Sequence, residues 1–178
     1  PLKNIDLLIK ALAEVGKNDK YKDIQLTIVG SARLPYEKEY EKKLHALTKA
    51  LDLVNNIKFM GHVSGQEKDI ILATSLALVL PSQSENFGNV VLEALAQGTP
   101  VIASKNTPWE MLESYNAGYW VNPELTTLTQ ALTSVLDLEK EKYIQMRINA
   151  YALCKSKFDI KSNINHWENY YKNITADV

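Results

Sequence analysis

Short apolar runs alternate with segments of helical periodicity along the chain. Runs rich in β-branched and other apolar residues predict strands at 24–29, 57–60, 76–80, 101–103 and 119–121. The helical pattern predicts helices at 4–16, 35–51, 65–74, 88–97, 108–115, 124–137, 139–156 and 160–175. Strands separated by helices of this length indicate βαβ units. We therefore expect a Rossmann-like α/β fold, with a parallel sheet and helices on both faces.

Two of the predicted helices begin with a recognisable local signal. Ser64 is followed three residues later by Glu67, and Thr107 is followed in the same way by Glu110. This spacing predicts a capping box, in which the hydroxyl and the carboxylate satisfy the first free amides of a helix. Pro108 would then occupy the first helical position, which proline favours.

The helix predicted at 88–97 contains one charged residue, Glu93, within the segment VVLEALA at 90–96. A helix that is apolar on all sides is expected to be buried. A carboxylate is rarely buried without a partner. We therefore expect hydrogen-bond donors at Glu93, supplied by the hydroxyls of a ligand or, as the alternative, by backbone or an arginine.

The start of the same helix suits a phosphate group. The segment beside Phe87 and Gly88 would present free backbone N–H groups and the positive end of the helix dipole. In an open α/β sheet, ligands bind outside the carboxyl ends of the strands, and the loop at 81–88 leaves such an end. A carboxylate for hydroxyls and amides for phosphate together point to a nucleotide-sugar.

Composition limits the class of protein. The chain has 178 residues, a hydrophobic content of 46% and a net charge of −1, which fit one globular domain and do not favour a nucleic-acid partner. The sequence shows no apolar run long enough to span a membrane. Cys154 is its only cysteine, which excludes an internal disulfide and fits a cytoplasmic location. We expect no metal site, because the sequence has no Cys/His cluster and no Asp-x-Asp.

The segment SENFGNVVLEALAQGTPVIAS at 84–104 resembles a known family. It is similar to the donor-binding, C-terminal half of GT-B-type retaining glycosyltransferases (group 1, family 4-like), and Glu85 and Glu93 match the family's E-x7-E motif. Weaker family blocks match LKNIDLLIKAL at 2–12, IVGSA at 28–32 and KFMGHV at 58–63. The resemblance covers roughly residues 1 to 137.

The resemblance implies a hexosyltransferase that uses a nucleoside-diphosphate sugar, with UDP- and GDP-sugars the favoured donors, and needs neither cofactor nor metal. The sugar would pass with retention of configuration to a saccharide or lipid-linked acceptor in polysaccharide or glycolipid biosynthesis. The acceptor would sit in a missing N-terminal domain, since we interpret the chain as a fragment of a longer protein. The full-length protein would be cytoplasmic, either free or peripheral to the inner face of the membrane, and the fragment alone inactive.

The resemblance also assigns roles to residues. Glu93 would accept the ribose hydroxyls, Glu85 would contact the donor sugar near the reacting carbon, and Lys3 would bind the diphosphate. An arginine that partners this lysine in the family has no counterpart in the sequence. Backbone amides would bind sugar and diphosphate at four consecutive residues, Asn86, Phe87, Gly88 and Asn89.

Two further donor contacts follow from the resemblance. The main chain of Val63 would contact the base, and Gly30 would lie near the diphosphate. The alternatives are that Glu85 is an ordinary loop acid, that Lys3 is a solvated surface lysine and that Asn89 caps a helix.

Two interpretations remain open at the level of the whole chain. The helix predicted at 160–175 has an aromatic face that packs either on this domain's own core or toward the missing acceptor domain. The alternative function is a non-catalytic doubly wound module that binds a nucleotide-sugar. A phospho-acceptor receiver domain is disfavoured, because the strand predicted at 24–29 is followed by Gly-Ser rather than by acidic residues.

Overall fold

The computed structural model describes residues 2–160 and residue 164, and its strands form two parallel sheets. The first sheet pairs β1 (Leu26–Val29) with β2 (Ile57–Gly61), and the second contains β3 (Leu78–Leu80), β4 (Val101–Ser104) and β5 (Gly118–Val121) in that order. The predicted strands are therefore all present and all parallel. The expected single sheet, however, is divided in two within the described residues.

Helices alternate with these strands as the periodicity predicts. Their bounds are α1 Ile5–Gly16, η1 Asp19–Tyr21 (a short 3-10 helix), α2 Pro35–Ala50, α3 Gly65–Thr74, α4 Asn89–Ala96, α5 Met111–Ser114, α6 Leu125–Leu136 and α7 Lys140–Phe158. The helix predicted at 160–175 lies outside the described residues except for Ile160 and Ile164. Its packing stays a prediction.

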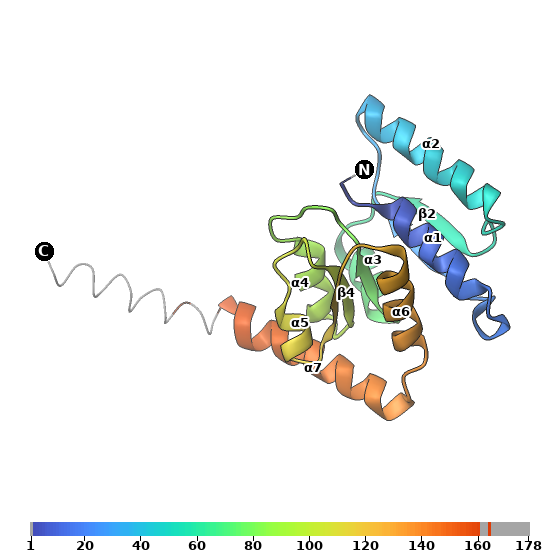
Figure 1. The fold of residues 1–178 in the computed structure, drawn as a ribbon. Coiled ribbons are helices and arrows are strands. Elements are labelled where there is room, and N and C mark those ends of the chain that lie inside the picture. The colour runs from blue at the N-terminus through green and yellow to red at the C-terminus, as the bar shows by residue number, and fades with distance from the viewer. Residues whose placement is uncertain (1, 161–163, 165–178) are drawn as a thin grey trace, which may run out of the picture.

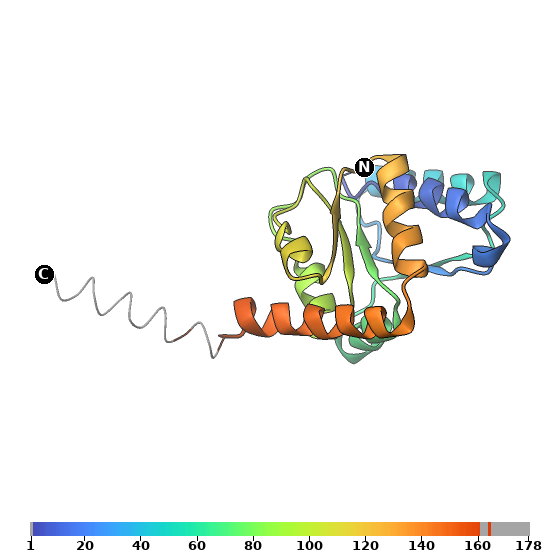
Figure 2. The ribbon, with the colours of Figure 1, turned by 60° about the horizontal axis from the view of Figure 1, so that its bottom comes forward.

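Helices cover both faces of the sheets, which confirms the predicted fold class (Figures 1 and 2). On β4, Val101 and Ala103 belong to a buried cluster with side chains of α4, α5 and α7. Ile102, between them in sequence, belongs instead to a cluster with α1 and α6. Alternate residues of one strand thus reach opposite helical layers, as the pleat of a strand requires. Cys154 of α7 packs against the first cluster, and burial raises the pKa of its thiol.

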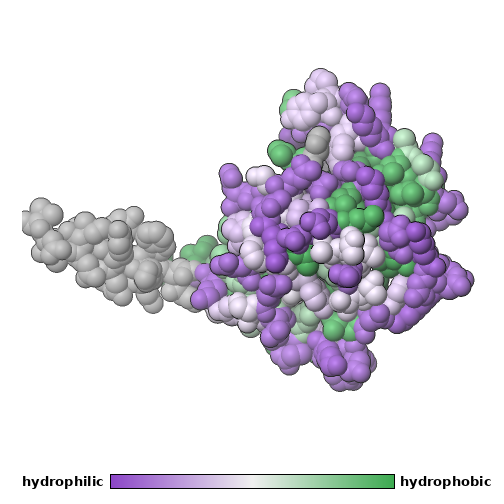
Figure 3. All heavy atoms as spheres, in the orientation of Figure 1, coloured by the Kyte–Doolittle hydropathy of each residue, from purple (hydrophilic) through white to green (hydrophobic). Residues whose placement is uncertain are grey.

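The two sheets are connected by apolar packing around α1. Leu8 of α1 shares one buried cluster with Leu26 of β1 and Val79 of β3, and Ile9 lies in a second cluster with side chains of α2 and β2. Among the described strands, β1 pairs only with β2 and β3 only with β4, so each has one unpaired edge. The face seen in Figure 3 is mostly hydrophilic, with apolar side chains in the region of α1 and α2.

The two predicted capping boxes are wrong. Ser64 is the N-cap of α3 but makes no side-chain capping bond. The Thr107 hydroxyl donates to the Ser104 carbonyl at 2.6 Å, so it holds the loop after β4 instead of starting a helix. As a result α5 begins three residues later than predicted, with Glu110 as its N-cap.

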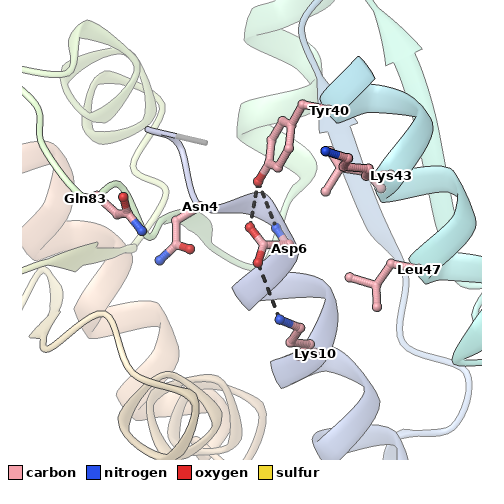
Figure 4. A pocket seen from close by; sticks show the side chains of 8 residues that line it. Asn4, Asp6, Lys10, Tyr40, Lys43, Leu47 and Gln83 are labelled. Atoms are coloured by element: carbon pink, nitrogen blue, oxygen red, sulfur yellow. Dashed lines mark hydrogen bonds and ion pairs between the residues drawn. The ribbon is translucent and has the colours of Figure 1, made fainter. Parts of the chain in front are cut away.

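A hydrogen-bonded pair also joins α1 to α2 beside a hollow of about 410 Å³ (Figure 4). The Tyr40 hydroxyl donates to the Asp6 carboxylate at 2.7 Å and accepts from the Asp6 amide at 3.2 Å. Burial and the bond to Asp6 raise the pKa of Tyr40 to about 12. Partial burial alone would raise the pKa of Asp6, but the bond from Tyr40 and the Lys10 ammonium lower it overall.

Gly118 at the start of β5 leaves no room for a side chain. Its φ is +156°, and a Cβ there would lie 1.9 Å from the Val101 carbonyl oxygen in the neighbouring strand. Gly118→Ala should therefore lower the free energy of unfolding by about 2–4 kcal/mol through overpacking. Chemical denaturation would measure the loss. The control is Gly16→Ala at the end of α1, where nothing lies within 4 Å. Equal stability of the two variants would contradict the prediction.

Tyr40→Phe should lower the free energy of unfolding at neutral pH by about 1–2 kcal/mol, since the bond to the Asp6 carboxylate and the longer bond from the Asp6 amide are both lost. The pKa of Asp6 is lower in the folded protein than its ordinary 3.8, so this stabilisation is complete above that value and declines as the pH falls through the folded pKa. The difference from the unsubstituted chain should shrink in acid, as denaturation at several pH values would show. Tyr36→Phe, at an exposed position on α2, is the control. A difference independent of pH would contradict this account.

Candidate donor-binding site

The loop between β3 and α4 contains most of the predicted site residues. It ends at Gly88, the N-cap of α4, where φ is +78°. A Cβ at this position would lie 3.1 Å from a methyl carbon of Leu80 and 3.2 Å from Cγ of Glu85. Glycine is therefore favoured both by backbone conformation and by the packing of the loop against β3. Asn89 is the first residue of the helix and not its cap, so the capping alternative for Asn89 is wrong.

An aromatic cluster supports this loop from inside the protein. Trp109 is fully buried, and its indole N–H donates to the carbonyl of Phe87. The rings of Phe87 and Trp109 lie 5.1 Å apart, and Phe158 at the end of α7 lies 5.8 and 5.5 Å from them. Sequence reasoning missed Trp109. Its place in the loop after β4 was the one available signal, because that loop leaves the same edge as the loop after β3.

Lys3 and Glu85 are separated by 82 residues, yet the structure brings them together. The Lys3 ammonium forms an ion pair with the Glu85 carboxylate. Beside them, the backbone N–H of Gln83 donates to the Leu2 carbonyl at 2.8 Å, which joins the N-terminal segment to the loop after β3. The Lys3 side chain is 57% exposed and that of Glu85 is 18% exposed. Both predicted catalytic residues therefore lie at one edge of the second sheet, with Lys3 still open to solvent.

Glu93 lies on a helix that is buried on one side only, so the expectation of burial on all sides is wrong. Val91, Ala94 and Leu95 are fully buried, whereas the Glu93 side chain is 35% exposed. The reason is that α4 belongs to the outer helical layer and packs against the sheet with one face. Lys68 of α3 donates to Oε1 of Glu93 at 2.7 Å. The expected donor is thus present, but it is a lysine and not backbone or an arginine.

The remaining predicted residues follow the ends of the strands. Gly30 follows β1, has φ +146°, and donates its N–H to the Gly61 carbonyl at 2.7 Å. Val63 follows β2 and is 8% exposed. Asn86 and Phe87 are exposed in the loop after β3. Each of these loops follows the carboxyl end of a strand, where α/β proteins bind ligands. Because the strands are parallel within each sheet, the loops of one sheet lie at the same end of it.

Metal-binding clusters, membrane-spanning helices and hollows were considered for all the residues that the structure describes. Among the residues that the structure describes, no three His, Cys, Asp or Glu side chains are grouped so that they could hold a metal ion. Within the same residues, no helix is long and apolar enough to cross a membrane. The hollow between α1 and α2 lies next to the site, since Asn4 and Gln83 are part of its lining (Figure 4).

Comparison with known proteins identifies relatives of the same class. The chain is 38% identical over 110 residues to a GDP-mannose-dependent monoacylated alpha-(1-6)-phosphatidylinositol monomannoside mannosyltransferase of Corynebacterium glutamicum, covering 58% of this chain and 26% of the relative. It is similar to the crystal structure of Anabaena HepE in complex with UDP, with a TM-score of 0.85 and 27% identity over 97% of this chain and 46% of that one.

A further solved structure locates this chain within such proteins. The C-terminal domain of the group 1 glycosyl transferase LpcC from Francisella tularensis matches with a TM-score of 0.78 and 25% identity, covering 89% of this chain and 81% of that one. By contrast, the chain spans less than half the length of the curated relatives it matches.

These findings confirm the resemblance to the C-terminal half of GT-B glycosyltransferases. The family model described as "Glycosyl transferases group 1" matches residues 1–153. This chain belongs to the group 1 glycosyl transferase family.

Proposed function

We propose that this chain is the donor-binding part of a retaining glycosyltransferase that transfers a sugar from UDP- or GDP-sugar to a saccharide or lipid-linked acceptor. The observation that carries the proposal is the contact between Lys3 and Glu85, two residues 82 positions apart that meet beside the start of α4. Membership of the group 1 family supports it, as do relatives described as using GDP-mannose or binding UDP. The reaction would serve polysaccharide or glycolipid biosynthesis, with the acceptor held by another domain.

The diphosphate would lie at the start of α4. No side chain caps this helix, so the first amides, beginning with Asn89, remain available together with the positive end of the helix dipole. Lys3 would add a cation from the N-terminal segment. As the bond to the sugar breaks, negative charge grows on the leaving diphosphate, and these groups would stabilise it without a metal ion.

Glu85 would act on the sugar. Its carboxylate lies on the same loop as the phosphate-binding amides and is largely shielded from water, with 18% of the side chain exposed. On donor binding, the Lys3 ammonium would turn to phosphate and the Glu85 carboxylate to sugar hydroxyls near the reacting carbon. There it would stabilise positive charge in the transition state. The departing diphosphate would accept the proton of the acceptor hydroxyl. The acceptor oxygen would then attack the reacting carbon from the face that the diphosphate leaves, so the configuration of that carbon is retained.

Lys3→Met should weaken binding of a nucleoside diphosphate by about tenfold, because a cation at the phosphates is lost. Binding of the corresponding nucleoside should be unchanged. Isothermal titration with UDP, GDP, uridine and guanosine would measure both. The matched control is Lys17→Met, because Lys17 is an exposed lysine paired with Glu14 at the far end of α1. Equal weakening of nucleoside and diphosphate would contradict the role of Lys3.

Glu85→Gln in the full-length protein should lower turnover by about 10²–10³-fold, the usual effect of losing one transition-state contact. Donor affinity should change by less than about threefold, since Gln keeps the shape and one acceptor oxygen. Kinetics with donor titration would separate the two. Glu39→Gln, at an exposed acid paired with Lys43 on α2, is the control. An equal loss of turnover and donor binding would instead favour a non-catalytic binding module.

A further inference from the structure

The ion pair between α3 and α4 gives Glu93 a fixed geometry. Lys68 Nζ lies 2.7 Å from Glu93 Oε1, although the two residues are 25 positions apart. Their side chains are 31% and 35% exposed, so the pair is partly buried and partly in contact with solvent. Within the described part of the chain, Oε2 of Glu93 has no hydrogen-bond partner.

From this geometry we propose that Lys68 is a positioning residue, which holds the Glu93 carboxylate ready for the adjacent hydroxyls of the donor's ribose. The inference rests on the proposed function, in which Glu93 accepts those hydroxyls. A glutamate that is one-third exposed can sample several rotamers, and all but one of them are lost when a ligand binds, at a cost in conformational entropy. Anchoring Oε1 removes that cost before the nucleotide arrives, while Oε2 remains free.

The chemistry of the two side chains fits a neutral diol and does not fit an anionic group, which the Glu93 carboxylate would repel. Two adjacent hydroxyls present two donors, and a carboxylate offers four lone-pair sites. With one site of Oε1 used by Lys68, enough acceptors remain for both hydroxyls. The lysine itself accepts no hydrogen bond, so it cannot bind a hydroxyl proton in place of Glu93.

The place of Lys68 in the fold supports the same role. It lies on α3, which follows directly on the loop that contains Val63, the position proposed to contact the base. The loop and the helix that follows it would therefore carry the base contact and the anchor for the ribose acceptor, respectively. A partly exposed ion pair contributes only about 0–1 kcal/mol to folding, so the pair is not needed to keep α3 beside α4. Removal of the lysine should therefore leave the fold intact.

The test compares ribonucleotides with analogues that lack the two hydroxyls. Titration of the chain with UDP and GDP, and with their 2′,3′-dideoxy forms, gives a preference ratio that reports only on the diol. The unmodified chain should prefer the ribonucleotide of the base that it binds by at least about tenfold, the usual value of a charged hydrogen bond. Lys68→Met should reduce that ratio at least fivefold, while affinity for the dideoxy form stays within about twofold.

Three further variants make the outcome specific. Lys68→Arg should keep most of the preference, because a guanidinium can still anchor the carboxylate. Glu93→Gln should lose the preference, and Lys43→Met, at a lysine paired with Glu39 on α2, should retain it. A circular-dichroism melt should place the Lys68→Met midpoint within about 4 °C of the unmodified chain, in keeping with the small energy of such a pair.

The results separate this inference from the function on which it rests. If the unmodified chain binds no nucleotide, or binds ribo and dideoxy forms equally, the proposed donor site or the role of Glu93 is overturned. If the unmodified chain prefers the ribonucleotide and Lys68→Met keeps that preference, the inference about Lys68 is overturned while the donor site stands. A loss of affinity that is equal for both forms would also overturn it, because that is the effect of a purely structural lysine.

Discussion

The packing of α1 is the constraint on which the rest of the structure depends. No strand hydrogen bonds connect the two sheets within the described residues, so side chains of α1 connect them instead. Leu8 faces a cluster that reaches β1 and β3, while Ile9 and Leu12 face α2 and β2. Because Lys3 lies two residues before this helix, the same packing sets where its ammonium can meet Glu85. Folding of the core and assembly of the site are therefore linked through one helix.

Much of the fold could be predicted from the sequence, because hydrophobic periodicity and β-branched runs report directly on local structure. The strand at 101–103 is a good example, since it is buried on both faces and reads as a continuous apolar run. Apart from the division of the sheet in two, the failures were local. Thr107 had two possible partners, and a carbonyl of its own loop won over the amides of a helix. Sequence spacing cannot decide such a competition, because the loop's path is set by tertiary packing.

The site shows the same division. The motif around Glu85 and Glu93 predicts which residues bind the donor, and that stays a prediction, whereas the immediate partners of these residues could not be predicted from the sequence. Lys68 and Trp109 lie in other loops and helices, and only the three-dimensional arrangement places them against Glu93 and Phe87. The uniform apolarity of the segment around Glu93 was also misleading. Small side chains such as Ala96 are tolerated at an exposed position of a helix without marking it as core.

The unpaired edges of β1 and β3 have a consequence for the behaviour of this chain in solution. Each edge presents a row of backbone donors and acceptors that no described strand satisfies, and Val29 at the end of β1 is an exposed apolar side chain on it. Such edges are templates for any extended segment, whether from the same polypeptide or from a neighbouring molecule. Leu26 of β1 and Val79 of β3 both pack in the buried cluster with α1, so cover by that helix is what limits strand addition at these two edges.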